Sequence, residues 1–295
     1  MFDSDQAEGL RRLLARSAAR VVAVVGARSE LGATSVVVNL AAAWARSGKD
    51  VLILDEHVSH NNVANTFALK PRYDLLNVLR GDKKLREVIL RANEGIQILP
   101  VARAMQTIHK LQDNERNKLL ELLTHAATGA DVVLVDAAAR EGHSVCTSLS
   151  GDEPLMLVLN NTSSGLTESY AMLKQMASQN GRKSFDIVIN KVNNEAEAKA
   201  IFDSISKVAL QNLQVRLEYM GYIPLDEKLK SARQLCSSVV EAFPGAKSSV
   251  QFRGLAEHLM QTKSAIDEDA SGLAKVMQRV IRQARPINNV VSAIT

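Results

Sequence analysis

The residues best placed to do chemistry follow a short apolar run near the start of the chain. Five aliphatic residues at 21–25 precede a loop at 26–33, and helical spacing begins at Thr34 and Ser35. A strand, a loop and a helix start in this order form the arrangement that binds phosphate. The first backbone N–H groups of a helix lack partners within it and carry partial positive charge. The loop is therefore a candidate phosphate site.

The composition of this loop argues against a working phosphate site. A phosphate loop ends Gly-Lys-Ser/Thr, and its ammonium group reaches the β- and γ-phosphates. Here the ending is Gly32-Ala33-Thr34, and Glu30 adds a negative charge. At about 4 Å and an effective dielectric constant near 20, one such charge repels an anion by roughly 4 kcal/mol. Two interpretations follow: a nucleotide fold that has lost its chemistry, or a fold that never bound a nucleotide.

Two carboxylates stand where apolar strands are expected to end. Asp55 follows the run 51–54, and Asp136 follows the run 132–135. The second run has the form of a Walker B strand, whose carboxylate holds Mg²⁺ or a water of its shell. Acids at the carboxyl ends of parallel strands lie where ligands bind in such sheets. The alternative for Asp55 is that it caps the turn that follows.

The rest of the chain alternates strand-like apolar runs with amphipathic runs. This pattern predicts an α/β fold of three layers (α-β-α), with a mostly parallel, twisted sheet of about seven or eight strands. The expected strands are 21–25, 51–54, 96–99, 132–135, 155–159, 185–189 and 220–223, and the main helices are 34–46, 73–79, 85–90, 111–124, 163–177 and 195–209. The expected organisation is a helix at 1–19, an α/β domain at 20–262 and a helical tail at 263–295.

Composition narrows the class of protein further. A chain of 295 residues with 46% apolar residues can bury a full core, and its net charge of only +4 argues against nucleic acid as a partner. Cys146 and Cys236 lack metal-ligand spacing, so we expect reduced core thiols in a cytoplasmic protein. No apolar run approaches the roughly 20 residues that span a bilayer.

Both ends of the chain carry amphipathic segments. The segment 3–19 is a short charged helix candidate whose simplest interpretation is a solvated helix resting on the domain. Near the other end, one helix face carries Leu273, Val276, Met277, Val280 and Ile281, and the opposite face carries Lys275, Arg279 and Arg282. Basic amphipathic helices of this kind lie on anionic membranes or dock on a partner. The alternative is that the helix folds back onto its own domain.

Taken in order, these motifs resemble the MinD/ParA class of P-loop ATPases over about residues 20–260. The motifs are the deviant loop, the Walker B strand, Asn190-Lys191-Val192 and the stretch 221–226, GYIPLD. Within that class the chain is most similar to the FlhG/FleN regulators of flagellar number. The discriminating stretch is 5–11, DQAEGLR, which is similar to the DQAxxLR activator helix of that subfamily.

The resemblance implies a site and shows where it is degenerate. The family loop reads Lys-Gly-Gly-x-Gly-Lys-Thr, and Arg28 and Ala33 stand at its two lysines. His57 replaces the acid that positions water, and Arg140 replaces the glycine after Walker B. The implied cofactor is ATP or ADP with Mg²⁺. The residues that would contact the nucleotide are Arg28, Gly32, Ala33, Thr34, Ser35 and, at adenine, Asn190. Thr34, Asp55 and Asp136 would lie near Mg²⁺. The departures argue against useful hydrolysis.

The resemblance also implies partners. The stretch 5–11 would insert into FlhF, a GTPase of the signal-recognition type, using Asp5, Gln6, Ala7, Leu10 and Arg11. Gln6 would orient water in the GTPase, and Arg11 would make a docking salt bridge. Other implied contacts are flagellar basal-body or regulatory proteins, a homodimer, and the inner face of the membrane at the cell pole. Two rival functions remain: an active MinD-type ATPase that uses Arg28, and a ParA-like positioner of DNA or cargo.

Overall fold

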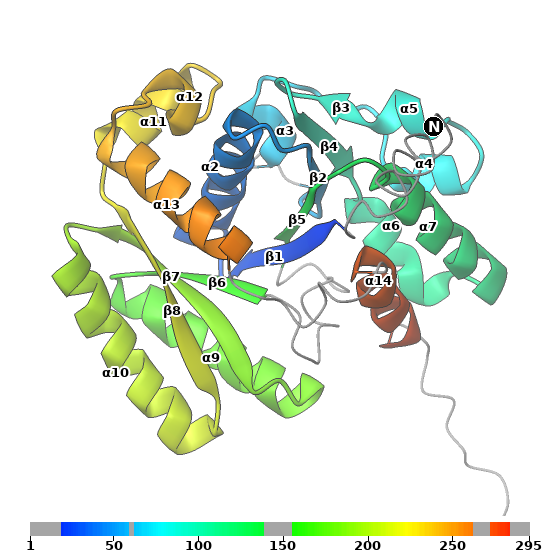
Figure 1. Ribbon diagram of the computed structural model, residues 1–295. Helices are drawn as coiled ribbons and strands as arrows, with labels where there is room; N and C mark the ends of the chain where they lie inside the picture. Colours follow the sequence, from blue (N-terminus) through cyan, green and yellow to red (C-terminus); the bar gives the residue numbers. More distant parts are fainter. Residues whose placement is uncertain (1–18, 59–61, 139–154, 262–271, 284–295) are drawn as a thin grey trace, which may run out of the picture.

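An eight-stranded sheet with helices on both faces forms the body of the protein (Figure 1). The computed structural model describes residues 19–58, 62–138, 155–261 and 272–283. The strand order is β3-β4-β2-β5-β1-β6-β7-β8, and every ladder except β3–β4 is parallel. The strands are β1 (Arg20–Gly26), β2 (Val51–Asp55), β3 (Leu90–Arg91), β4 (Ile96–Pro100), β5 (Val132–Ala137), β6 (Leu155–Asn160), β7 (Ser184–Val192) and β8 (Arg216–Pro224). The predicted three-layer α/β fold is confirmed.

Alternate residues of each central strand face opposite layers of helices. In β1, Val22 and Val24 pack with α2 and α13, whereas Val21, Ala23 and Val25 pack with the layer that holds α7, α9 and α10. The helices are α2 (Ala33–Arg46), α3 (Val63–Thr66), α4 (Leu75–Leu79), α5 (Leu85–Val88), α6 (Ala102–Thr107), α7 (Asp113–Ala126), α9 (Ser163–Asn180), α10 (Glu195–Leu213), α11 (Glu227–Gln234), α12 (Val239–Ala242), α13 (Lys247–Gln261) and α14 (Gly272–Gln283). Two 3₁₀ turns complete them, η1 (Ser29–Leu31) and η2 (Ile108–Lys110).

Several elements differ from the expectation. The helix expected at 85–90 ends at Val88, because Leu90 enters β3 and pairs antiparallel with Ile98. Neither α3 nor α6 was predicted as a helix, and β3 was not predicted as a strand. Strand β8 begins at Arg216 rather than at 220, because it lies at the edge of the sheet and alternates exposed with buried residues, so its first half shows no apolar run.

Helix α14 lies against its own domain in this structure. Its five apolar residues, Leu273, Val276, Met277, Val280 and Ile281, are buried in the same core cluster as residues of α7 and β1. Lys275, Arg279 and Arg282 are exposed on the other side. Of the two alternatives for this helix, the structure therefore shows the fold-back. Within the described ranges no helix is both long and apolar enough to cross a bilayer, and surface attachment to a membrane stays a prediction.

Candidate functional site

The loop between β1 and α2 has a backbone shaped by glycine. Gly32 is the N-cap of α2 with φ of +96°, a left-handed conformation that favours glycine. A Cβ at this position would also collide with the side-chain amide nitrogen of Asn190. No side chain caps α2, so its first N–H groups face the loop without a capping partner. The backbone of the predicted phosphate cradle is thus present at the predicted place.

The end of β7 supports this loop from one side. The side-chain amide of Asn190 donates to the Leu31 carbonyl at 2.8 Å, and Lys191 Nζ donates to the Glu30 carbonyl at 3.0 Å. Lys191 has a φ of +61°, which is uncommon for a residue with a side chain. The contact of Lys191 with the loop was not predicted from the sequence. Its position directly after Asn190, at the end of a strand, was the available signal.

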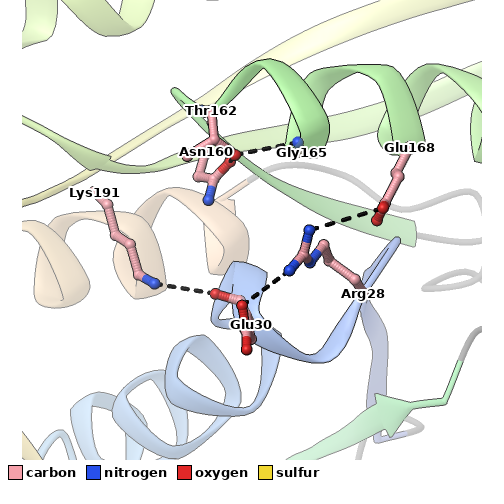
Figure 2. A network of polar contacts seen from close by, with 7 residues as sticks. All are labelled: Arg28, Glu30, Asn160, Thr162, Gly165, Glu168 and Lys191. Carbon is pink, nitrogen blue, oxygen red and sulfur yellow. Dashed lines mark hydrogen bonds and ion pairs between the residues drawn. The ribbon is translucent and has the colours of Figure 1, made fainter.

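The cation that replaces the first family lysine is held between two carboxylates. Arg28 Nη2 lies 2.9 Å from Glu30 Oε2, and Arg28 Nη1 lies 3.7 Å from Glu168 Oε1 on α9. Figure 2 shows the guanidinium between these two acids, with Lys191 reaching the loop from the other side. Sequence reasoning missed Glu168, because an acid in the middle of a surface helix carries no signal of this role.

The two strand-end carboxylates, each expected where ligands bind in such sheets, come together in the fold. Asp55 and Asp136 are register partners on the neighbouring parallel strands β2 and β5. Burial, and secondly the charge of Asp136, raise the pKa of Asp55 to about 7. Asp55 also accepts hydrogen bonds from the backbone N–H groups of His57 and Val63, each at 3.0 Å. Asp55 therefore does cap the turn after β2, the alternative left open above.

Asp136 is the member of this pair that fits a cation. Its side chain is fully buried, and Oδ2 accepts from Thr34 Oγ1 at 2.8 Å, with His57 Nε2 at 3.5 Å. Oδ1 has no hydrogen-bond partner among the described residues. Thr34 and Asp136 thus fit the edge of a Mg²⁺ site, whereas both carboxylate oxygens of Asp55 are already used by backbone N–H groups. The described part of the chain has no group of three or more His, Cys, Asp or Glu suited to a metal, so phosphate oxygens and water would supply the remaining ligands.

A third buried acid links the loops that follow β2 and β5. Glu56 Oε2 accepts from the backbone N–H of Ala138 at 3.1 Å, and the Glu56 N–H donates to the Asp136 carbonyl at 3.2 Å. Both residues of the first contact are buried. Sequence reasoning missed Glu56, because it lies in a polar stretch that looks solvent-exposed.

A cavity of about 550 Å³ opens beside the loop. Its lining includes Thr34, Ser35 and Asn190, together with Leu225, which follows β8, and Lys230 on α11. A space of this size, next to an uncapped helix start, can receive a ligand of nucleotide size. Ala33 is buried at the first position of α2 and offers no charge to such a ligand.

Several predicted residues lie elsewhere or outside the described ranges. The activator-like residues Asp5, Gln6, Ala7, Leu10 and Arg11, together with Arg140 and Cys146, fall outside the described residues. The expectation of two core thiols is wrong for Cys236, which is exposed. Cys236 follows the end of α11 with a φ of +52°, a turn conformation that the apolar pattern of the sequence did not reveal.

The sheet order, the glycine-bearing loop before α2 and the paired acids define a nucleotide-binding α/β fold of the P-loop type. Solved structures share this fold. The MinC:MinD complex of Aquifex aeolicus aligns with a TM-score of 0.62 and 22% identity over 83% of this chain and 97% of that one. MinD of Pyrococcus horikoshii, solved with Mg-ADP, aligns with a TM-score of 0.59 and 20% identity, covering 82% and 96% of the two chains.

Similarity in sequence identifies the family within this fold. Residues 22–235 match the CobQ/CobB/MinD/ParA nucleotide binding domain. The antiactivator FleN of Pseudomonas aeruginosa is 32% identical over 238 residues, covering 81% of this chain and 85% of FleN. The flagellum site-determining protein YlxH of Helicobacter pylori is 22% identical over 89% of this chain and 90% of YlxH. The chain belongs to the MinD/ParA family and, within it, to the FleN/FlhG group of flagellar regulators.

Proposed function

We propose that this regulator controls flagellar number and placement through protein contacts, with weak or no ATP hydrolysis. The observation that carries the proposal is the state of the loop. Ala33 stands where the family has the phosphate lysine, and Arg28 is engaged by Glu30 and Glu168. A backbone cradle thus persists without the cations that would stabilise a transferring phosphoryl group.

The magnitude of the loss supports this proposal. Removing one preorganised donor from a transition state lowers the rate by about 10²–10³-fold. This chain lacks the phosphate lysine and has His57 in place of the water-positioning acid. His57 lies against Asp136 instead, 3.5 Å from its Oδ2. With both groups lost, the protein could still bind a nucleotide but would hydrolyse it very slowly.

The proposed partner is an FlhF-like GTPase, contacted by the stretch 5–11. This motif needs no ATP chemistry of its own, and it survives in a chain whose loop is degenerate. Further proposed contacts are flagellar basal-body or transcriptional regulators, a second copy of this chain, and the membrane surface at the cell pole.

The test is GTP turnover by purified FlhF with the full chain, and with a peptide of residues 1–20. Stimulation by both, and its loss in the Gln6→Ala forms, is the expected result. Gln175→Ala, an exposed glutamine on α9, is the control in the full chain. Absence of stimulation, or equal stimulation by the Gln6→Ala peptide, would refute the GTPase role.

One observation favours a second candidate, an active MinD-type ATPase. Asp136 keeps a buried carboxylate oxygen with no partner among the described residues, beside Thr34, which suits Mg²⁺ brought by a nucleotide. Steady-state ATP hydrolysis at the rate of active relatives, lost in Asp136→Ala, would establish this function. Equilibrium binding of ATP with and without Mg²⁺ separates binding from turnover.

A further inference from the structure

Glu30 engages the two cations that contact the loop in Figure 2. Its carboxylate pairs with Arg28 at 2.9 Å, and its backbone carbonyl accepts from Lys191 Nζ at 3.0 Å. The Glu30 side chain is 77% exposed, so packing does not hold it in place. Its position is set by the short turn η1 and by these polar contacts.

These contacts affect how well the loop can bind an anion, because Arg28 is its main positively charged side chain. Ala33 supplies no charge, and Gly32 and Thr34 offer only backbone and hydroxyl groups. Within the loop, an incoming polyphosphate would therefore depend on the uncapped start of α2 and on Arg28, with Lys191 and Lys230 among the cations that line the neighbouring cavity. In this structure Arg28 already faces a carboxylate of its own loop.

We propose that Glu30 is an internal counter-anion of this loop, which occupies Arg28 and thereby lowers the affinity of the α2 amino terminus for polyphosphate. The inference deepens the proposed function, since it rests on treating the loop as a degenerate phosphate site. It adds a second reason for weak phosphate binding: besides lacking a lysine, the loop carries an acid that repels the anion. Like charges repel and a paired guanidinium is less available, so both effects act in the same direction.

The geometry indicates what happens when the carboxylate is removed. Arg28 retains Glu168 on α9, 3.7 Å away, so the guanidinium stays beside the loop. The hydrogen bond from Lys191 goes to a backbone carbonyl, so a change of the Glu30 side chain leaves that acceptor in place. Glu30→Gln thus removes a charge and keeps the size and the backbone of the loop.

The experiment is isothermal titration of the full chain with inorganic triphosphate, and separately with ATP, at low and high salt. We expect Glu30→Gln to bind triphosphate roughly tenfold more tightly than the unchanged chain, the factor that about 1.4 kcal/mol produces; the repulsion is this small because solvent screens a side chain that is 77% exposed. The gain should shrink at high salt. The matched control is Glu94→Gln, an exposed acid in the turn before β4, which makes the same change in net charge.

A double variant tests whether Arg28 is the cation that Glu30 occupies. Arg28→Ala combined with Glu30→Gln should lose most of the gain. Equal affinities of Glu30→Gln and Glu94→Gln would overturn the proposal, and so would a gain that persists in full without Arg28. Neither result would touch the proposed GTPase role, which is measured by GTP turnover. Circular dichroism and thermal unfolding of each variant establish that it is folded.

Discussion

Thr34 and Asp136, 102 positions apart in the chain, are joined by a hydrogen bond of 2.8 Å between Oγ1 and Oδ2. The bond forms because β1 and β5 are adjacent parallel strands, so the helix that follows β1 starts beside the end of β5. It links the hydroxyl at the start of α2 to the Walker B carboxylate. The remaining oxygen of Asp136 is buried with no partner among the described residues.

Asp136→Asn should stabilise the protein in the absence of ligand. The change removes a buried charge next to Asp55 and keeps an oxygen that can accept from Thr34. We expect the free energy of unfolding to rise by roughly 1–2 kcal/mol, measured by urea denaturation at neutral pH. The exposed Asp82 provides the control Asp82→Asn. A loss of stability would show that the charge of Asp136 is favourably compensated.

Gly32→Ala should destabilise the loop for two separable reasons, the positive φ and the collision with Asn190. Gly81 also has a positive φ, +86°, but a Cβ there would meet nothing within 4 Å. Gly81→Ala therefore measures the backbone effect alone, and we expect it to lower the free energy of unfolding by about 1 kcal/mol. Gly32→Ala should lower it by at least about 2 kcal/mol, because the collision adds to the backbone effect. Equal losses in paired denaturation curves would mean that Asn190 moves aside without strain.

Met277→Asp should test whether α14 belongs to the folded core. Met277 is fully buried in the cluster shared with α7 and β1, whereas the next residue, Gln278, is exposed. We expect Met277→Asp to lower the free energy of unfolding by about 3 kcal/mol and Gln278→Asp to change it little. A small effect of Met277→Asp would indicate that α14 leaves the domain readily, as membrane attachment requires.

Stability should depend on pH through Asp186 on β7. Burial, and secondly the charge of Glu218, raise the pKa of Asp186 to about 6. A raised pKa means that the folded state binds the proton more tightly than the unfolded chain. Stability should therefore fall as the pH rises from about 4 to about 6. Asp186→Asn should make this part of the curve less steep, the remaining fall being due to Asp55, whose pKa is raised to about 7, whereas Asp203→Asn, at an exposed position of α10, should leave the slope unchanged.

Periodicity in the sequence was enough to predict the class of fold and most of the strands. The run 132–135 is apolar on both faces because β5 is a central strand covered by helices, and that requirement is local to the strand. The elements at the sheet edges were predicted less well for the converse reason. The first half of β8 alternates exposed with buried residues and β3 has only two residues, so neither stretch carries the apolar run that identifies a strand.

The loss of the phosphate-binding lysine from the loop could also be recognised in the sequence. The absence of an ammonium at Ala33 is a matter of residue type, and no fold can supply the missing group there. The sequence likewise placed Asp55 and Asp136 each at the carboxyl end of a parallel strand, where ligands bind, whereas their pairing follows from the adjacency of β2 and β5 in the folded sheet.

Tertiary structure alone decided how the remaining charges are used. Arg28 pairs with Glu168, Lys191 reaches the Glu30 carbonyl and Glu56 binds Ala138, each across a long gap in the chain. The packing of α14 was decided in the same way. An amphipathic pattern indicates that one face of a helix will be buried away from water. A lipid surface and a groove on the same domain can bury that face equally well. Which one does so depends on whether the domain presents an apolar surface of the right shape, and only the assembled sheet and α7 show that it does.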